Sequence, residues 1–168
     1  MNTEPTAAGT DGIALETMLC FDLYSASRAM TSVYRQALDP LGLTYPQYLV
    51  LVVLWTGGEQ PVRQVVERLR LDYGTVSPLL KRLEQRGLVE RRRRADDERS
   101  VTISLTEAGA ALRAQARDVP ARIGAAFGLE PDDMATLARL LATVTATATR
   151  HAAGTSGDAA GAAGDATA

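Results

Sequence analysis

The segment from residue 61 to residue 105 constrains the fold more than any other part of the chain. Two short amphipathic helices, separated by a polar turn that contains glycine, are followed directly by two short strands. The strands are expected at about 88–93 and 100–105, and the turn between them is highly charged. This order predicts a winged helix-turn-helix, with the helix-turn-helix at about 61–87 and the wing at about 88–105.

Amphipathic helices flank this module on both sides. Apolar residues recur at helical spacing over about 13–38 and again within about 106–150, where a first helix is expected to run from Thr106 to about Phe127 without a break. These helices carry more apolar surface than a domain of this size can cover alone, so they predict dimerisation. The expected fold is mainly α with a small β wing: one winged-helix domain over residues 13–150, with N- and C-terminal dimerisation helices.

The two ends of the chain do not have the composition of a packed structure. Residues 1–12 are polar and are expected to be flexible, and residues 151–168 are predicted to form a disordered Ala/Gly tail. The N-terminus lacks the basic flank and apolar core of a secretion signal, and the longest apolar stretch, Tyr48 to Trp55, is far too short to cross a bilayer. We therefore expect a cytoplasmic protein with no membrane partner.

The net charge conceals a basic segment. The formal charge is −2, but residues 61–100 hold eleven Arg and Lys against seven Asp and Glu. A basic module inside an acidic frame is expected of a nucleic-acid-binding protein, although a solvated charged face would give the same count.

The second helix of the helix-turn-helix has an apolar stripe for packing and a polar stripe suited to the major groove of double-stranded DNA. The residues expected to contact DNA from this helix are Thr75, Ser77, Pro78, Lys81 and Arg82. Pro78 is expected near the helix start, where its missing N–H has a small cost. An ordinary amphipathic surface helix would show the same stripes, and the hairpin that follows favours the DNA-reading interpretation.

The charged turn of the hairpin supplies a second set of candidates. Arg99 can enter the minor groove, with Asp97 two residues earlier to orient it. The run Arg91 to Arg94 is expected along the preceding strand, where Arg93 and its neighbours can contact phosphates. The alternative is a solvated charged turn.

The chain has one cysteine and one histidine. A single cysteine excludes an intrachain disulfide and a Cys-rich zinc site, and His151 lies in the polar tail, away from any catalytic partner. We therefore expect no enzymatic site, no metal and no cofactor. A free thiol in the cytoplasm stays reduced until an oxidant reaches it.

The cysteine, Cys20, lies in the first long helix with Tyr24 one turn further along the same face. Tyr34 is fourteen residues from Cys20, which returns it to nearly the same face but about 21 Å along the helix axis. Tyr34 can therefore reach only the thiol of a partner subunit, if the two first helices pack antiparallel. Phenolic O–H groups are donors that would stabilise a thiolate. The alternative is that Cys20 is a small core residue.

Four segments together resemble a known family. They read LCFDLY from Leu19, LTYPQY from Leu43, PLLKRLE from Pro78 and DERSV from Asp97. In this order, from about Leu15 to Pro120, the chain is similar to the organic-hydroperoxide-sensing OhrR branch of the MarR family. The wing segment is shared by MarR proteins generally, whereas the Cys-containing helix with TYPQY is more specific to this branch.

The resemblance implies a homodimeric repressor whose thiolate is oxidised to sulfenic acid by organic hydroperoxides, which releases operator DNA. It implies that Cys20 is the reactive cysteine, that Tyr24 and Tyr34 bond to it, and that the residues named above on the second helix and wing contact DNA. Because no second cysteine exists, the chain resembles the one-cysteine type, whose sulfenic acid is capped by a small thiol or a backbone nitrogen, or is overoxidised.

One departure and two alternatives stay open. Tyr73 stands where the family more often has Ser, which puts operator contacts at that turn in doubt. A MarR-type repressor released by a small phenolic ligand, with a structural Cys20, is the main alternative. A thiol peroxidase is less favoured, because neither a second cysteine nor a suitably placed histidine is present to support turnover.

Overall fold

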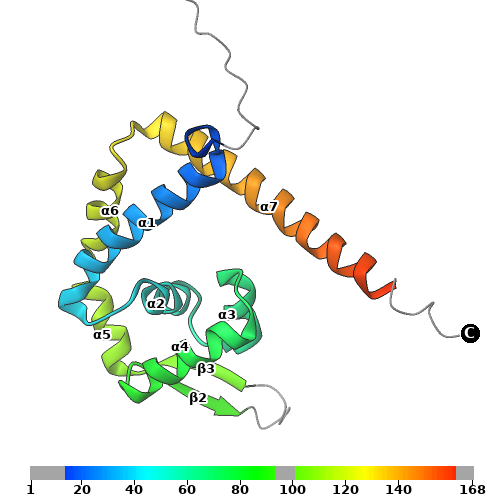
Figure 1. Cartoon of the computed structure of the whole chain (residues 1–168). Helices are drawn as coiled ribbons and strands as arrows, with labels where there is room; N and C mark the ends of the chain where they lie inside the picture. Colours follow the sequence, from blue (N-terminus) through cyan, green and yellow to red (C-terminus); the bar gives the residue numbers. More distant parts are fainter. Residues whose placement is uncertain (1–13, 94–100, 162–168) are drawn as a thin grey trace, which may run out of the picture. The chain divides into compact units, whose positions relative to one another are not determined.

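The computed structural model describes residues 14–93 and 101–161, which divide into two compact units at Ala126–Phe127. Figure 1 shows the elements in sequence colours. In chain order they are a 3-10 turn at Leu15–Thr17, α1 Leu19–Leu38, a 3-10 turn at Asp39–Leu41, α2 Tyr45–Gly57, β1 Gln60–Pro61, α3 Val62–Leu69, α4 Tyr73–Gln85, β2 Val89–Arg93, β3 Val101–Leu105, α5 Glu107–Gln115, α6 Val119–Phe127 and α7 Pro131–Gly161.

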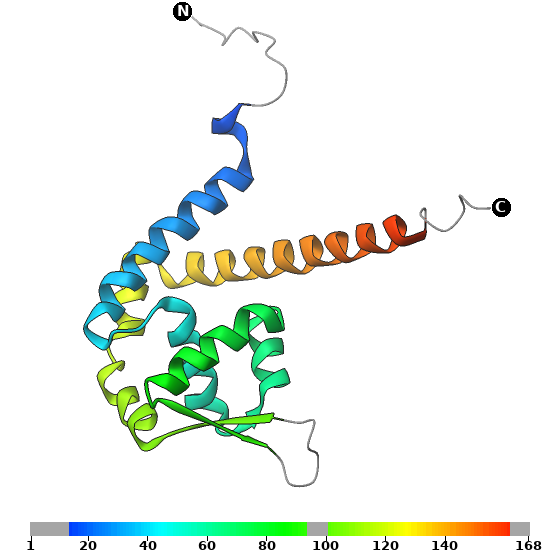
Figure 2. The same cartoon turned by 60° about the horizontal axis from the view of Figure 1, so that its bottom comes forward.

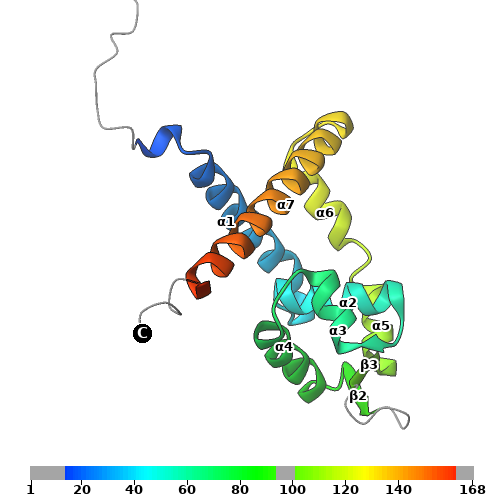
Figure 3. The same ribbon diagram turned by 90° about the vertical axis from the view of Figure 1, so that its right-hand side faces the viewer.

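The core of the first unit forms around α2, because this helix is apolar on nearly all sides. Helices α3 and α4 and the strands surround it (Figures 1 and 3). The largest fully buried side chains come from α1, α2, α3, α4 and the sheet: Leu38, Val50, Leu51, Leu54, Val65, Val76, Leu80, Leu83, Val89 and Ile103. A single core therefore fixes both helices of the helix-turn-helix and the base of the wing.

The small sheet is antiparallel with the strand order β1-β3-β2. Strands β2 and β3 confirm the predicted hairpin, and their register pairs Arg91 with Ile103 and Arg92 with Thr102. The two-residue β1 was not predicted, because a strand of this length has no detectable alternation. It pairs Gln60 with Ile103 and so attaches the start of α3 to the wing.

Helix α1 begins later than the sequence predicts. The apolar spacing from residue 13 suggested one continuous helix, but Met18 has an extended backbone that separates a 3-10 turn from α1. Only the C-terminal end of α1 is buried in the core, at Ala37 and Leu38. Met30, Val33 and Tyr34 pack partly against this core, and the N-terminal part of the helix extends away from α2, α3 and α4 (Figures 1 and 2).

The predicted continuous helix from Thr106 to Phe127 is also two helices. The chain breaks between α5 and α6, where the N–H of Val119 bonds to the Ala116 carbonyl at 3.2 Å instead of continuing the α-helical pattern. Pro120 explains the break, since it has no N–H to donate to the Ala116 carbonyl.

The second unit consists mainly of α7, which is 31 residues long. Its first turn carries Asp132 and Asp133, which favour a helix N-terminus. The helix continues to Gly161, past residue 151 where the sequence predicted a loose tail, and the many alanines of this segment have the highest helix propensity. The predicted flexible N-terminus, 1–12, and the last seven residues lie outside the described residues.

No single helix of the described chain is long and apolar enough to cross a membrane. Helix α1 with its 3-10 turn and α2 together have the length and composition, but they are bent by 70°.

Candidate functional site

The inner face of α4 packs into the core and its outer face is exposed. Val76, Leu80 and Leu83 are fully buried. Four of the five residues predicted to read DNA from this helix are exposed and the fifth, Ser77, is half-buried; the exposed four are Thr75, Pro78, Lys81 and Arg82. The structure therefore brings these predicted residues together on one helix, with an outer surface open to a partner.

The N-terminus of α4 is capped by Asp72. The backbone N–H of Thr75 donates to Asp72 Oδ1 at 2.8 Å, and the Thr75 hydroxyl donates to Oδ2 at 2.6 Å. These bonds, the hydroxyl bond first, hold the pKa of the Asp72 carboxyl below its ordinary value. Thr75 thus fixes the start of the helix in addition to facing outward.

Pro78, which the sequence predicts near the helix start, lies in the second turn of α4. At this position the proline has no N–H for the carbonyl of Gly74, so α4 loses one backbone hydrogen bond. Asp72 caps the helix too early for Pro78 to fall in the first turn.

Strand β2 uses its arginines differently from the prediction that all would line up for phosphate contact. Arg91 turns toward α4, where Nη2 donates to the Ser77 carbonyl at 3.1 Å and Nε lies 3.5 Å from a carboxylate oxygen of Glu84. Arg91 Nε is a buried polar atom without a hydrogen-bond partner in the described part of the chain. Arg91 therefore connects β2 to α4.

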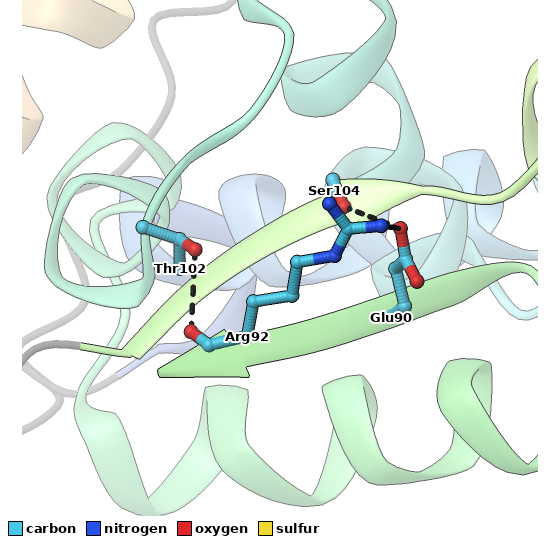
Figure 4. Close-up of polar contacts among 4 residues, drawn as sticks. All are labelled: Glu90, Arg92, Thr102 and Ser104. Carbon is cyan, nitrogen blue, oxygen red and sulfur yellow. Dashed lines mark hydrogen bonds and ion pairs between the residues drawn. The ribbon is translucent and has the colours of Figure 1, made fainter. Parts of the chain in front are cut away.

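Arg92 lies on the other face of the hairpin. Its Nη2 is 2.8 Å from Glu90 Oε1, which also accepts from the Ser104 hydroxyl at 3.2 Å. The Thr102 hydroxyl donates to the Arg92 carbonyl at 3.2 Å, so the four residues connect both strands (Figure 4). Arg93 ends β2 opposite Val101, and the predicted wing-tip residues Asp97 and Arg99 lie outside the described residues.

Cys20 is exposed on the first turn of α1, so it is not a core residue of a single chain. Apolar neighbours share this exposure: Leu19 is 68% exposed, Phe21 37% and Tyr24 57%. The Arg28 guanidinium lies 5.6 Å from the Tyr24 ring centre, and Arg28 Nη1 is 3.4 Å from the Tyr24 hydroxyl. Among the described residues of the first unit, the first half of α1 therefore presents a thiol within an exposed apolar surface.

Tyr34 lies at the other end of α1 and turns toward α2. Its ring stacks on Tyr45 with centroids 3.9 Å apart and lies 6.2 Å from the ring of Tyr48. The pKa of Tyr34 is raised to about 12. Burial of the phenol is the largest cause, followed by the charge of Tyr45 and a side-chain hydrogen bond with Tyr45. Cys20 and Tyr34 are fourteen residues apart on one helix, which places them about 21 Å apart along its axis.

Tyr45 is a second candidate phenol beside Tyr34, and it was not predicted from the sequence. It is the first residue of α2, placed there by a start in which the Thr44 N–H donates to Gln47 Oε1 at 3.0 Å. The turn between α1 and α2 bends the chain by 70° and brings Tyr45 onto Tyr34. The sequence signal was the tight Asp39-Pro40-Leu41-Gly42 turn, which brings the end of one helix close to the start of the next.

A cleft of about 630 Å³ separates α2 from α5. Its lining includes Tyr48, Val52 and Trp55 from α2 and two arginines from α5 and its end, Arg113 and Arg117. Trp55 Nε1 donates to the Gly109 carbonyl at 2.9 Å and holds the two helices together at one end of the cleft. Among the described residues, no group of His, Cys, Asp or Glu is arranged to hold a metal ion.

Comparison with known proteins agrees with this architecture. The family model described as transcriptional regulator SarA/Rot matches residues 32–115. The organic hydroperoxide resistance transcriptional regulator of Bacillus subtilis (strain 168) is 52% identical over 113 residues, which cover 67% of this chain and 77% of that protein.

Several solved structures are also similar to this chain. AbfR, a protein of Staphylococcus epidermidis, has been solved bound to DNA in reduced and in overoxidised form. Both structures are 33% identical with a TM-score of 0.68, and cover 79% of this chain and 92% or 94% of AbfR. The PcaV regulator of Streptomyces coelicolor, in complex with its natural ligand, is 26% identical with a TM-score of 0.76, covering 83% and 99% of the two chains.

The chain has a helix-turn-helix packed on a core, a three-stranded sheet and flanking helices. Together these define a winged-helix transcription regulator. The chain belongs to the MarR family of these regulators, on the branch of the organic hydroperoxide resistance transcriptional regulator.

Proposed function

We propose that this regulator represses by binding operator DNA as a homodimer in the cytoplasm, and leaves the operator when an organic hydroperoxide oxidises Cys20. One observation supports this most: Cys20 is exposed within an apolar surface at the start of α1, while the stacked phenols of Tyr34, near the other end of α1, and Tyr45, at the start of α2, lie together. An antiparallel pair of α1 helices would cover the apolar surface and bring each thiol to the partner's phenols.

The proposed DNA contacts come from α4 and the wing. Lys81 and Arg82 bind phosphates or base edges, and Thr75, Ser77 and Pro78 face the major groove. Arg93 contacts the backbone from the end of β2, and Arg99, oriented by Asp97, enters the minor groove. In a dimer, the two α4 helices would read half-sites about 34 Å apart.

The proposed redox step begins with the Cys20 thiolate, which hydrogen bonds from Tyr24 of its own helix and from the partner's phenols stabilise. The thiolate sulfur attacks the outer peroxide oxygen, the O–O bond breaks, and the alkoxide takes a proton to leave as an alcohol. Sulfur is oxidised to the sulfenic acid while the hydroperoxide is reduced. A small cellular thiol then displaces water from the sulfenic acid and forms a mixed disulfide.

We propose that the mixed disulfide, because of its bulk, is the form that releases DNA. A thiol adduct would separate the packed apolar surface around Cys20, whereas added oxygen atoms are small. The occurrence of AbfR on DNA in an overoxidised form supports a distinction between these two products.

The proposal is tested by measuring operator binding by the wild type and by Cys20→Ser. Each protein is measured before and after treatment with cumene hydroperoxide, with and without a small thiol. Wild type should lose affinity on oxidation, most strongly when the thiol is present, and Cys20→Ser should bind equally well throughout. Oxidant release of the serine variant would exclude the cysteine switch. Continuous consumption of peroxide with recycling of the thiol would instead indicate a peroxidase.

The second candidate function is release by a small phenolic ligand. The α2–α5 cleft favours it, because two arginines beside Tyr48 and Trp55 suit an aromatic carboxylate. Salicylate-like compounds that release the operator from Cys20→Ser would support this function, and Arg113→Gln should then weaken the response.

A further inference from the structure

Arg86 joins the reading helix to the turn between α1 and α2. It is the C-cap residue directly after Gln85, the last residue of α4, and its guanidinium makes two hydrogen bonds to backbone carbonyls. Nη1 donates to the Gly42 carbonyl at 2.6 Å and Nη2 donates to the Leu41 carbonyl at 3.1 Å. A guanidinium holds two neighbouring acceptors in a fixed geometry, which an ammonium cannot do.

The turn fits this guanidinium closely. Gly42 has a left-handed backbone with φ of 63°, and the Leu43 N–H bonds back to the Leu38 carbonyl at 3.2 Å, which closes α1. A Cβ atom at residue 42 would lie 3.1 Å from Arg86 Nη2. Both the backbone conformation and the space for Arg86 therefore depend on glycine at this position.

The same turn lies between the two stacked tyrosines. Tyr34 precedes the end of α1 by one turn, and Tyr45 follows Gly42 by three residues. The centroids of their rings are 3.9 Å apart, and the short segment that Arg86 holds connects the two residues along the chain. Arg86 thus connects the residues proposed to sense the partner's thiol with the end of the helix proposed to read DNA.

We propose that Arg86 is a positioning residue that couples the oxidation state of Cys20 to the placement of α4. The coupling rests on the proposed function, in which the phenols of Tyr34 and Tyr45 bond to the partner's Cys20 thiolate. Loss of those bonds on oxidation shifts the turn, and the guanidinium carries the shift to the C-terminal end of α4. In thermodynamic terms, Arg86 contributes to the coupling free energy between oxidation and operator binding.

The variant Arg86→Lys keeps the charge but cannot hold both carbonyls. Arg68→Lys is a matched control, because Arg68 also bonds a carbonyl and a hydroxyl, those of Val53 and Thr56, but joins α3 to the C-terminal end of α2. Gly42→Ala disturbs the Arg86 contact from the opposite side. For each full-length variant, the operator Kd is measured in the reduced form and after cumene hydroperoxide with a small thiol, with a melting curve.

The ratio of oxidised to reduced Kd is the decisive quantity. Arg86→Lys and Gly42→Ala should each lower this ratio at least about fivefold, while Arg68→Lys keeps the wild-type ratio. By linkage, operator DNA should also shift the thiol–disulfide equilibrium of Cys20 in a glutathione buffer, strongly in wild type and weakly in Arg86→Lys.

Other outcomes overturn the proposal in distinguishable ways. A wild-type ratio in Arg86→Lys shows that the signal does not pass through this contact. An equal loss of affinity in both redox states for Arg86→Lys and Gly42→Ala shows a purely structural role. If wild type itself does not change affinity on oxidation, the proposed function is wrong and the coupling through Arg86 is excluded with it.

Discussion

Two regions of this chain differ in how much of their apolar surface is buried. The reading half comprises α3, α4, β2 and β3, and the half proposed to sense oxidation, the sensing half, comprises α1 and the start of α2. In α4 the residues that face inward, Val76, Leu80 and Leu83, have no exposed surface. In the first half of α1 the large apolar residues remain open, with Leu19 exposed by 68% and Phe21 by 37%. The difference indicates that the core of the first unit completes the DNA-reading module, while the exposed apolar surface around Cys20 is of the kind that contacts another surface, as in the proposed dimer.

The largest effect is expected in the reading half. Leu83→Ala removes a fully buried side chain between α4 and the core and leaves a cavity, so the free energy of unfolding should fall by about 2–5 kcal/mol. Chemical denaturation at a fixed protein concentration measures this. A loss below about 1 kcal/mol would mean that the core around α4 relaxes freely and that the reading half is less complete than its burial indicates.

The same substitution at Leu19 should act on association instead of folding. Leu19→Ala removes an exposed side chain of α1, so each winged-helix unit should keep its stability. The proposed dimer should dissociate at least about tenfold more readily, because the loss would occur twice in a symmetric interface. Sedimentation or dilution experiments give the dissociation constant. An unchanged constant would remove the first half of α1 from the interface.

The sequence predicted the reading half well because its signals are local. Helical spacing, strand alternation and glycine-containing turns each act within a few residues, and they located α3, α4, β2 and β3 correctly. The break before Pro120 also had a local cause, but the strong apolar spacing on both sides obscured it.

The contacts between different helices and strands could not be predicted in this way. Tyr45 on Tyr34, Arg91 on Ser77 and Arg86 on Gly42 all join residues that are distant along the chain, and no periodicity specifies them. They depend on how the elements pack around α2, which the sequence pattern constrains only as a buried helix. The sensing half is also the part whose proposed partner surface belongs to a second copy.

The two halves should respond to opposite extremes of pH. Tyr34 has a folded pKa of about 12, above its ordinary value of 10.0, so the folded state holds this proton more tightly. The resulting stability is fully present below pH 10 and decreases as the pH rises toward 12. Tyr34→Phe should flatten the melting temperature over this range, and an equal alkaline loss in the variant would assign the effect to other groups.

In the reading half the corresponding group is Asp72, whose hydrogen bonds from Thr75 lower its pKa. Its contribution is present above the ordinary carboxyl pKa and decreases as the pH falls through the lower folded value. Asp72→Asn keeps an acceptor for the helix cap and removes this acid dependence, whereas Asp72→Ala should lower the melting temperature at neutral pH as well. Equal melting curves for Asn, Ala and wild type would show that α4 does not depend on its cap.

The smallest expected effect concerns Tyr73, which among the described residues of the reading half is the one large apolar side chain that is exposed. It begins α4 and is 59% exposed, so its ring is available to the base edges or sugars that the N-terminus of a reading helix meets. Tyr73→Ser should leave the melting temperature and the dimer unchanged and weaken operator binding by about 1 kcal/mol, roughly fivefold in Kd. Tyr73→Phe separates ring contact from hydroxyl contact. If Tyr73→Ser, Tyr73→Phe and the wild type bind the operator with equal affinity, the exposed ring of Tyr73 does not contact DNA.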